Sequence, residues 1–205
     1  MNTRIGFGWD SHAFKPGVPL RIGGLTLDHN EGLAGHSDGD VLLHAITDAL
    51  LGAVAAGDIG TYFPPGDPRW KDADSAVFLN LALEELEHAG YRIVNIDTTL
   101  VLAAPKISPI AGEMRARVAD LLGVEIDQVS IKAKTPEGMN LDHVVQCHAI
   151  ALVERSIKPE ELASMSAVIE TQRQLEDVVE DLLSSVHGVP KKRVVVPVYD
   201  TEDIT

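Results

Sequence analysis

The chain has 205 residues, of which 45% are hydrophobic and 23% are charged, and its formal net charge is −14. A chain of this size can bury a core as one domain with an appendage. Nucleic acids and anionic membranes attract clusters of Lys and Arg, so the acidic charge argues against both classes of partner. The apolar runs are far shorter than the roughly 20 residues that span a membrane. The single cysteine, Cys147, cannot form an internal disulfide, so we expect a buried thiol in a cytoplasmic protein.

Strand and helix patterns alternate along the first part of the chain. Residues 3–9 predict a strand, and residues 19–27 predict two short strands around a Gly-Gly turn. From residue 41, apolar side chains recur at three- and four-residue spacing, which predicts a helix that SDGD begins and Gly57 ends. Further helices are expected over 75–88 and 108–123, and further strands over 93–102, 129–134 and 144–154. The alternation predicts an α/β (α+β) sandwich, with a mixed β-sheet and helices on one side.

The character of the sequence changes near residue 158, so we expect one domain over 1–157 and an extension over 158–205. A nearly uninterrupted helical pattern begins at Pro159 and ends before Gly188. A seven-residue repeat indicates coiled-coil positions a and d, occupied by Met165, Val168, Gln172, Leu175, Val179, Leu182 and Val186. Three more apolar residues, Ile169, Val178 and Leu183, widen this face, which favours docking on the globular domain or a neighbouring subunit over a free-standing coiled coil. Residues 193–199, RVVVPVY, predict an edge strand.

Asp10 and His12 are the first candidate functional residues. Side chains two positions apart in a strand project to the same face. His44 lies in the first turns of the next predicted helix, and Asp/His/His with an open fourth position is the ligand set of a catalytic divalent metal, zinc above all. Asp48, one turn further, is a candidate to orient the His44 imidazole. The alternative is a pair of polar residues at a strand end, but more polar groups surround the helix start than capping requires: His36, Ser37, Asp38 and Asp40.

A set of longer motifs covers about residues 3–155. In chain order these are RIGFGWDSHAF, GLAGHSDGDVLLHAITDALLGAVAAGDIG, YFPPGDP, LVLAAPKISP and VSIKAKTPEG. Together they resemble the 2-C-methyl-D-erythritol 2,4-cyclodiphosphate synthase family of the non-mevalonate isoprenoid pathway. The resemblance implies a homotrimeric lyase with active sites between neighbouring subunits. In the implied reaction, the 2-phosphate of a CDP-linked methylerythritol 2-phosphate attacks the β-phosphorus, and CMP leaves.

The resemblance also implies roles for individual residues. Asp10, His12 and His44 would hold Zn²⁺ or another divalent transition metal, and Glu137 would hold Mg²⁺ or Mn²⁺ at the diphosphate. His36 and Thr135 match residues that stabilise the transition state. Substrate contacts are implied for Ser37, Asp58, Ile59, Gly60, Phe63 and Asp67, and a cytidine pocket on the adjacent subunit for Ala103, Ala104, Pro105, Lys106, Ile107, Ala133 and Lys134. Ordinary structural roles remain open for Asp58, Lys106 and Thr135.

The chain departs from the family pattern at two places. After KAKTPEG, the segment MNLDHVVQCHA is shorter and lacks the arginine and glutamate of a GRGEG-like turn, which line the central channel of the family's trimer. The resemblance therefore does not extend to a phosphate or prenyl-diphosphate ligand in that channel. Pro65 replaces the first acidic residue of an FPDTD-like loop beside the substrate. These departures and the tail leave an alternative function, a non-catalytic or repurposed trimer that acts as a binding or scaffold protein.

Overall fold

The computed structural model describes residues 2–156 and 159–187, and the chain divides into two compact units, Met1–Ser156 and Ile157–Thr205. Five strands of the first unit form one sheet in the order β4-β1-β7-β5-β6. Their bounds are Glu31–Leu33 for β4, Thr3–Pro16 for β1, Val144–Arg155 for β7, Tyr91–Val101 for β5 and Val129–Lys134 for β6. Only β5 and β6 are parallel neighbours, so the predicted mixed sheet is confirmed.

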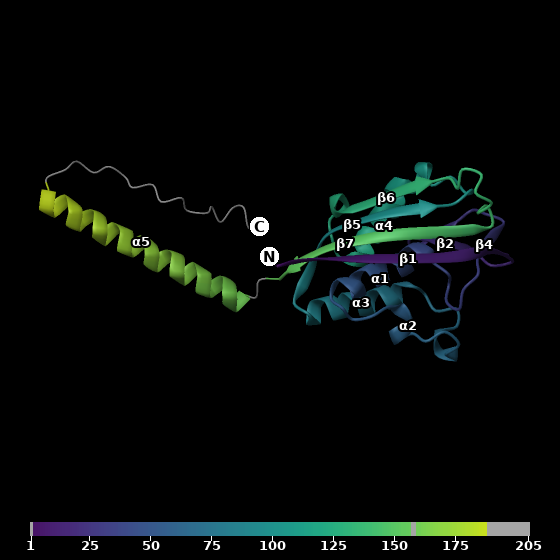
Figure 1. The fold of residues 1–205 in the computed structure, drawn as a ribbon, viewed down its shortest axis with the longest axis horizontal. Helices are drawn as coiled ribbons and strands as arrows, with labels where there is room; N and C mark the ends of the chain where they lie inside the picture. The colour runs from purple at the N-terminus through teal and green to yellow at the C-terminus, as the bar shows by residue number, and fades with distance from the viewer. Residues whose placement is uncertain (1, 157–158, 188–205) are drawn as a thin grey trace. The chain divides into compact units, whose positions relative to one another are not determined.

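Three longer helices of this unit pack on one face of the sheet (Figure 1). Helix α1 (Val41–Ala53) lies against β1 and β7, α4 (Ala111–Leu122) contacts β6, and α3 (Ala76–His88) contacts both α1 and α4. On this face β7 presents fully buried small and apolar side chains, among them Cys147, and burial raises the pKa of that thiol. Short helical turns occupy the connections, namely α2 (Ile59–Tyr62), η1 (Pro68–Trp70), η2 (Ser108–Ile110) and η3 (Ile126–Gln128).

The opposite face of the sheet carries exposed apolar side chains. Those of Ile5, Phe7 and Trp9 on β1 and Ile150 on β7 are between 45% and 70% exposed. The ring of His148 lies 6.1 Å from that of Phe7 and 6.5 Å from that of Trp9, measured between centroids. Because neighbouring exposed apolar groups mark interaction surfaces more often than single ones do, this patch is a candidate interface.

Two glycines of β1 allow α1 to approach the sheet closely. A Cβ atom at Gly6 would lie 1.7 Å from the carbonyl oxygen of Ala49, and one at Gly8 would lie 1.9 Å from that of Ala45. Both distances are far below van der Waals contact, so only glycine fits at these two strand positions. The helix is in turn built from small residues where it meets the strand, which brings the two backbones together.

A short hairpin fixes the start of α1. Strands β2 (Leu20–Ile22) and β3 (Leu25–Leu27) are joined by Gly23 and Gly24, both with positive φ, as the predicted Gly-Gly turn requires. The N–H groups of these glycines donate to the carboxylate of Asp40 at 2.9 and 2.7 Å. The same carboxylate accepts from the first turn of α1 and is its N-cap. Burial raises the pKa of Asp40, and the amide donors oppose that rise.

Two boundaries differ from the sequence prediction. Strand β1 continues to Pro16, well past the predicted end at residue 9. The prediction that α1 continues to Gly57 is wrong, because the helix ends at Ala53 and a turn with Ala55 at φ 59° follows. Strand β4 was not predicted, and it pairs with the extended end of β1.

Helix α5 (Pro159–His187) is the described part of the second unit. Six of its apolar side chains are between 52% and 65% exposed, those of Val168, Leu175, Val178, Val179, Leu182 and Leu183. The predicted edge strand at 193–199 lies outside the described residues. Among the described residues, each helix is either too short or too polar to cross a bilayer.

The glycine contact predicts a specific sensitivity of the fold. We expect Gly8→Ala to lower the free energy of unfolding by about 3 kcal/mol, because the added methyl group must push α1 off the strand. The matched control is Gly52→Ala in α1, where a Cβ would meet only the Phe7 carbonyl oxygen at 3.8 Å. This control should be neutral or more stable by up to about 1 kcal/mol. Urea unfolding of both variants measures the difference, and equal stabilities would contradict the proposed close contact.

Candidate active site

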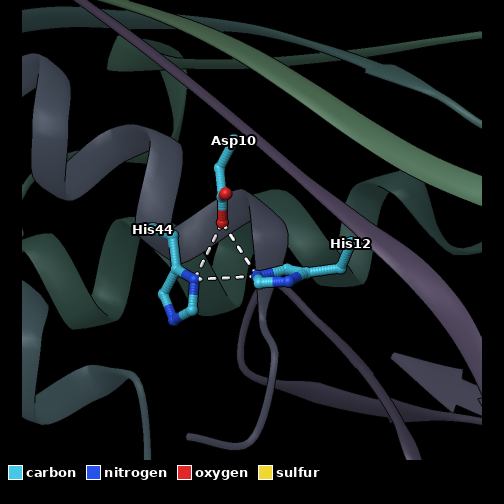
Figure 2. Close-up of side chains that lie close together, drawn as sticks. All are labelled: Asp10, His12 and His44. Carbon is cyan, nitrogen blue, oxygen red and sulfur yellow. Dashed lines mark hydrogen bonds and ion pairs between the residues drawn. The ribbon is translucent and has the colours of Figure 1, made fainter. Parts of the chain in front are cut away.

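Asp10, His12 and His44 converge where β1 meets the start of α1 (Figure 2). Asp10 and His12 continue the row of alternate β1 positions that begins with Gly6 and Gly8, so their side chains also face the helix. Asp10 Oδ2 lies 2.9 Å from His12 Nε2 and 2.9 Å from His44 Nδ1, and the two imidazole nitrogens are 3.1 Å apart. The predicted convergence of these three side chains is therefore present.

The three donor atoms suit a divalent metal. Ligand atoms around a tetrahedral zinc with bonds of 2.0–2.1 Å lie about 3.3 Å apart, so an ion fits after each pair separates by a few tenths of an ångström. Burial alone would raise the pKa of Asp10, but hydrogen bonds from His12 and His44 and their charges hold it well below its usual range. The carboxylate is thus ionised and ready to bind a cation. The set can hold a metal, and its chemistry alone does not select zinc among divalent transition metals.

The second ring nitrogen of His44 is held by serines. Its Nε2 lies 2.8 Å from Ser75 Oγ and 3.2 Å from Ser37 Oγ. Asp48, which we expected to orient this ring, instead accepts a hydrogen bond from the Ile59 N–H at 2.8 Å. The expectation for Asp48 is therefore wrong, and Ser75, which the sequence analysis did not select, takes that place.

Further predicted residues lie in the connections before and after α1. His36 Nε2 lies 2.8 Å from the carbonyl oxygen of Asp67, which brings these two candidates together. Asp58 is the N-cap of α2, and its Oδ1 accepts from the N–H and the hydroxyl of Thr61, which lowers the pKa of Asp58. A structural role for Asp58 thus exists beside any substrate contact.

An aromatic cluster lies under this part of the site. The Phe63 ring lies tilted against Phe78 at a centroid distance of 4.4 Å and meets Trp70 edge-on at 4.8 Å. Phe78 in turn lies 5.9 Å from the His44 ring. Ile59 and Gly60 open α2 beside Asp48. The cluster therefore supports the loop that carries the predicted substrate contacts.

The predicted cytidine-pocket residues form a second group, at the carboxyl ends of β5 and β6. Residues 103–107 follow β5, and Ala133 and Lys134 end β6, where the Lys134 carbonyl oxygen accepts from the N–H of Leu102. Ala103, Ala104 and Lys106 are exposed and Pro105 is half-buried, whereas the Ile107 side chain belongs to the core, so any nucleotide contact from Ile107 would come from its backbone. Just past β6, the Thr135 hydroxyl donates to the Glu137 carboxylate, and Glu137 has a positive φ of 47°.

One chain does not bring the two groups into contact. Asp10 pairs with Cys147, Cys147 with Leu100 and Leu100 with Ala133, so a row of four strands joins the groups. Three strand spacings separate Asp10 from Ala133, which is about 14 Å between their backbones. The metal-side residues and the nucleotide-side residues therefore lie on opposite sides of β7.

Known proteins share this arrangement of strands and helices. The model of the YgbB family matches residues 3–154. A 2-C-methyl-D-erythritol 2,4-cyclodiphosphate synthase of Koribacter versatilis is 61% identical over 152 residues, which are 74% of this chain and 98% of that relative. A solved structure of such a synthase in a CDP-bound form is 38% identical, with a TM-score of 0.70 over 74% of this chain and 100% of that chain. The CDP complex of IspF from Plasmodium falciparum is 32% identical, with a TM-score of 0.67 over 76% of this chain and 99% of that chain.

Helix α5 lies outside the residues that the family model matches. The matched residues make up nearly all of the Koribacter relative, which leaves no room in it for a segment equivalent to this helix. The first unit alone therefore corresponds to a whole relative. Through residues 3–154, the chain belongs to the YgbB family.

Proposed function

We propose that this chain catalyses the metal-dependent cyclisation of 4-diphosphocytidyl-2-C-methyl-D-erythritol 2-phosphate to 2-C-methyl-D-erythritol 2,4-cyclodiphosphate, with release of CMP. The observation that carries the proposal is the Asp10, His12 and His44 cluster in a chain that is 61% identical to a relative of that name. The reaction is a phosphorus–oxygen lyase step of the non-mevalonate isoprenoid pathway, and we infer a cytoplasmic location from the single buried thiol. The comparisons give no support to the non-catalytic alternative.

The proposal gives each site residue a role in the reaction. Asp10, His12 and His44 hold a divalent metal, for which we propose zinc, and the bound ion supplies Lewis-acid polarisation and orientation of a phosphate oxygen. His36 and Thr135 donate to oxygens on which charge develops during phosphoryl transfer. Glu137 holds a second cation, Mg²⁺ or Mn²⁺, at the diphosphate. That cation is needed because a chain with a net charge of −14 repels a polyanion.

The assembly we propose is a homotrimer with active sites between subunits. The exposed sheet face with Ile5, Phe7 and Trp9 supports it, because an apolar patch of this kind is stabilised by burial against other copies. The separation of about 14 Å between the two groups of site residues within one chain also favours it. A metal site of one subunit would then work with Lys106, Lys134 and the rest of the nucleotide pocket on its neighbour.

We further propose that residues 158–205 reinforce this assembly and take no part in the chemistry. The apolar face of α5 is not covered by the helix itself, with Val168 and Leu175 each more than 60% exposed. Residues Val178 and Leu183 make this face wider than a narrow coiled-coil seam, which supports packing on the globular domain or a neighbouring subunit.

The metal assignment predicts a loss of zinc on ligand removal. We expect the purified chain to carry about one zinc per chain and His44→Ala to lose it, since a site with three protein ligands cannot spare one. The control is His88→Ala, which removes an exposed imidazole at the end of α3. Elemental analysis after gel filtration measures both. Stoichiometric zinc in His44→Ala would show that the ligand set is wrong.

The catalytic roles predict that two substitutions act on different kinetic constants. Thr135→Ala should lower kcat by roughly 10²-fold with little change in KM, because its donor acts where charge develops. Asp58→Ala should mainly raise KM. CMP release from the CDP-linked substrate is the assay, and Thr26→Ala, an exposed threonine of β3, is the control. A wild-type chain that carries zinc and releases no CMP would favour the binding or scaffold alternative.

The assembly proposal predicts opposite outcomes for two changes. Phe7→Glu should dissociate the trimer and abolish CMP release, because it puts a charge into the buried interface, whereas Ile126→Glu, at an exposed apolar side chain of η3, should do neither.

A chain truncated after Ile157 should remain a CMP-releasing trimer with a lower Tm. Light scattering and thermal melts measure these outcomes. Loss of activity from the truncated chain with trimer and zinc intact would move the tail into the active site.

A further inference from the structure

The buried hydroxyl of Ser75 has no role in its own helix. Ser75 occupies the N-cap position of α3, where a serine hydroxyl normally accepts a hydrogen bond from the first turn, yet its side chain makes no capping bond. The Asp74 carboxylate accepts from the Ala76 N–H at 2.9 Å instead. Ser75 is fully buried, so its hydroxyl needs partners inside the protein.

Those partners are His44 and Asp38. Ser75 Oγ lies 2.8 Å from His44 Nε2, and the Ser75 hydroxyl donates to Asp38 Oδ1. Asp38 also accepts from the backbone N–H of Ser75 at 3.3 Å, which fixes the serine from two sides. Arg21 Nη1 lies 3.6 Å from Asp38 Oδ2, as an ion pair.

The Asp38 carboxylate, at the end of this series of hydrogen bonds, determines which group donates in each of them. A carboxylate only accepts, so the Ser75 hydroxyl proton points to Asp38 and the Ser75 oxygen is left to accept. The proton it accepts is the one on His44 Nε2. With its proton on Nε2, the imidazole presents the Nδ1 lone pair, and Nδ1 is the atom that a metal at the triad would contact. Without a metal, the Asp10 carboxylate, 2.9 Å from Nδ1, favours the opposite tautomer, and the Ser75 oxygen opposes that preference.

From this arrangement we propose that Ser75 and Asp38 are positioning residues that set the tautomer and orientation of His44 for metal binding. The inference rests on the proposed function only in requiring a metal at the triad. Partners of this kind typically change metal affinity by roughly 10- to 100-fold. Ser37 is the weaker neighbour of the same nitrogen, at 3.2 Å, and its hydroxyl also lies 3.4 Å from the N–H of Gly39.

The test compares zinc affinity in three single variants of the full chain. We expect Ser75→Ala to raise the zinc Kd by roughly 10- to 100-fold, and Asp38→Asn to raise it less, because the amide oxygen still accepts from the serine while the charge is lost. Asp74→Ala is the matched control, since it removes the actual cap of α3 next to Ser75. It should lower Tm and leave the zinc Kd unchanged. Competition with a chromophoric chelator measures the Kd.

A second measurement reports the tautomer directly. Long-range proton–nitrogen correlation spectra of the metal-free chain should show a larger share of the His44 form protonated on Nε2 in the wild type than in Ser75→Ala. A wild-type Kd and an unchanged tautomer in Ser75→Ala would overturn the proposal. Equal losses of zinc affinity in Ser75→Ala and Asp74→Ala would also overturn it, since they would trace the effect to a loosened helix start. Neither readout depends on CMP release, so this inference and the proposed catalysis are decided separately.

Discussion

The backbone contact between β1 and α1 sets the position of the whole candidate site. Gly6 and Gly8 leave no room for a Cβ under the carbonyl oxygens of Ala49 and Ala45, so the helix rests directly on the strand. Asp10 and His12 occupy the next two positions of the same strand face, beyond the contact, and His44 immediately precedes Ala45 on the helix. Because close-packed interiors transmit small shifts, any change in this contact also changes the distances among the three donor atoms.

The elements around that contact fix its remaining degrees of freedom. Asp40 joins the β2–β3 turn to the first turn of α1, so the helix can neither slide nor rotate without breaking buried hydrogen bonds. Ser75 and Asp38 then orient the ring of His44 from the side of α3. The site is thus held by a glycine contact along the strand, a capped helix start and a buried hydrogen-bond chain. Preorganisation of this kind is what metal-assisted phosphoryl transfer requires.

The longer helices and strands and the Asp10, His12 and His44 cluster can be predicted from the sequence because both leave local signals, whereas the short strand β4 leaves none. The helical spacing after residue 41 and the i, i+2 pair Asp10 and His12 are visible in one dimension. Helical spacing pointed to Asp48, one turn from His44, as the partner of that ring, whereas the actual partner, Ser75, comes from the start of another helix and has no local relation to His44 in the sequence. The importance of Gly6 and Gly8 was missed for a related reason, since a glycine in a strand signals close approach without naming what approaches.

The sheet itself explains why a single chain cannot complete the proposed site. The candidate side chains come from β1, α1, the connections on either side of α1, and the segments that end or follow β5 and β6. The strand order nevertheless puts β7 between the metal-binding and nucleotide-binding halves. A strand order fixed by hydrogen bonds cannot be altered by loop motion. The uncovered face, with Phe7 and Trp9 exposed, offers the apolar area that association of several chains would bury. The same sheet therefore separates the two halves within one subunit and provides the surface that would bring halves of different subunits together.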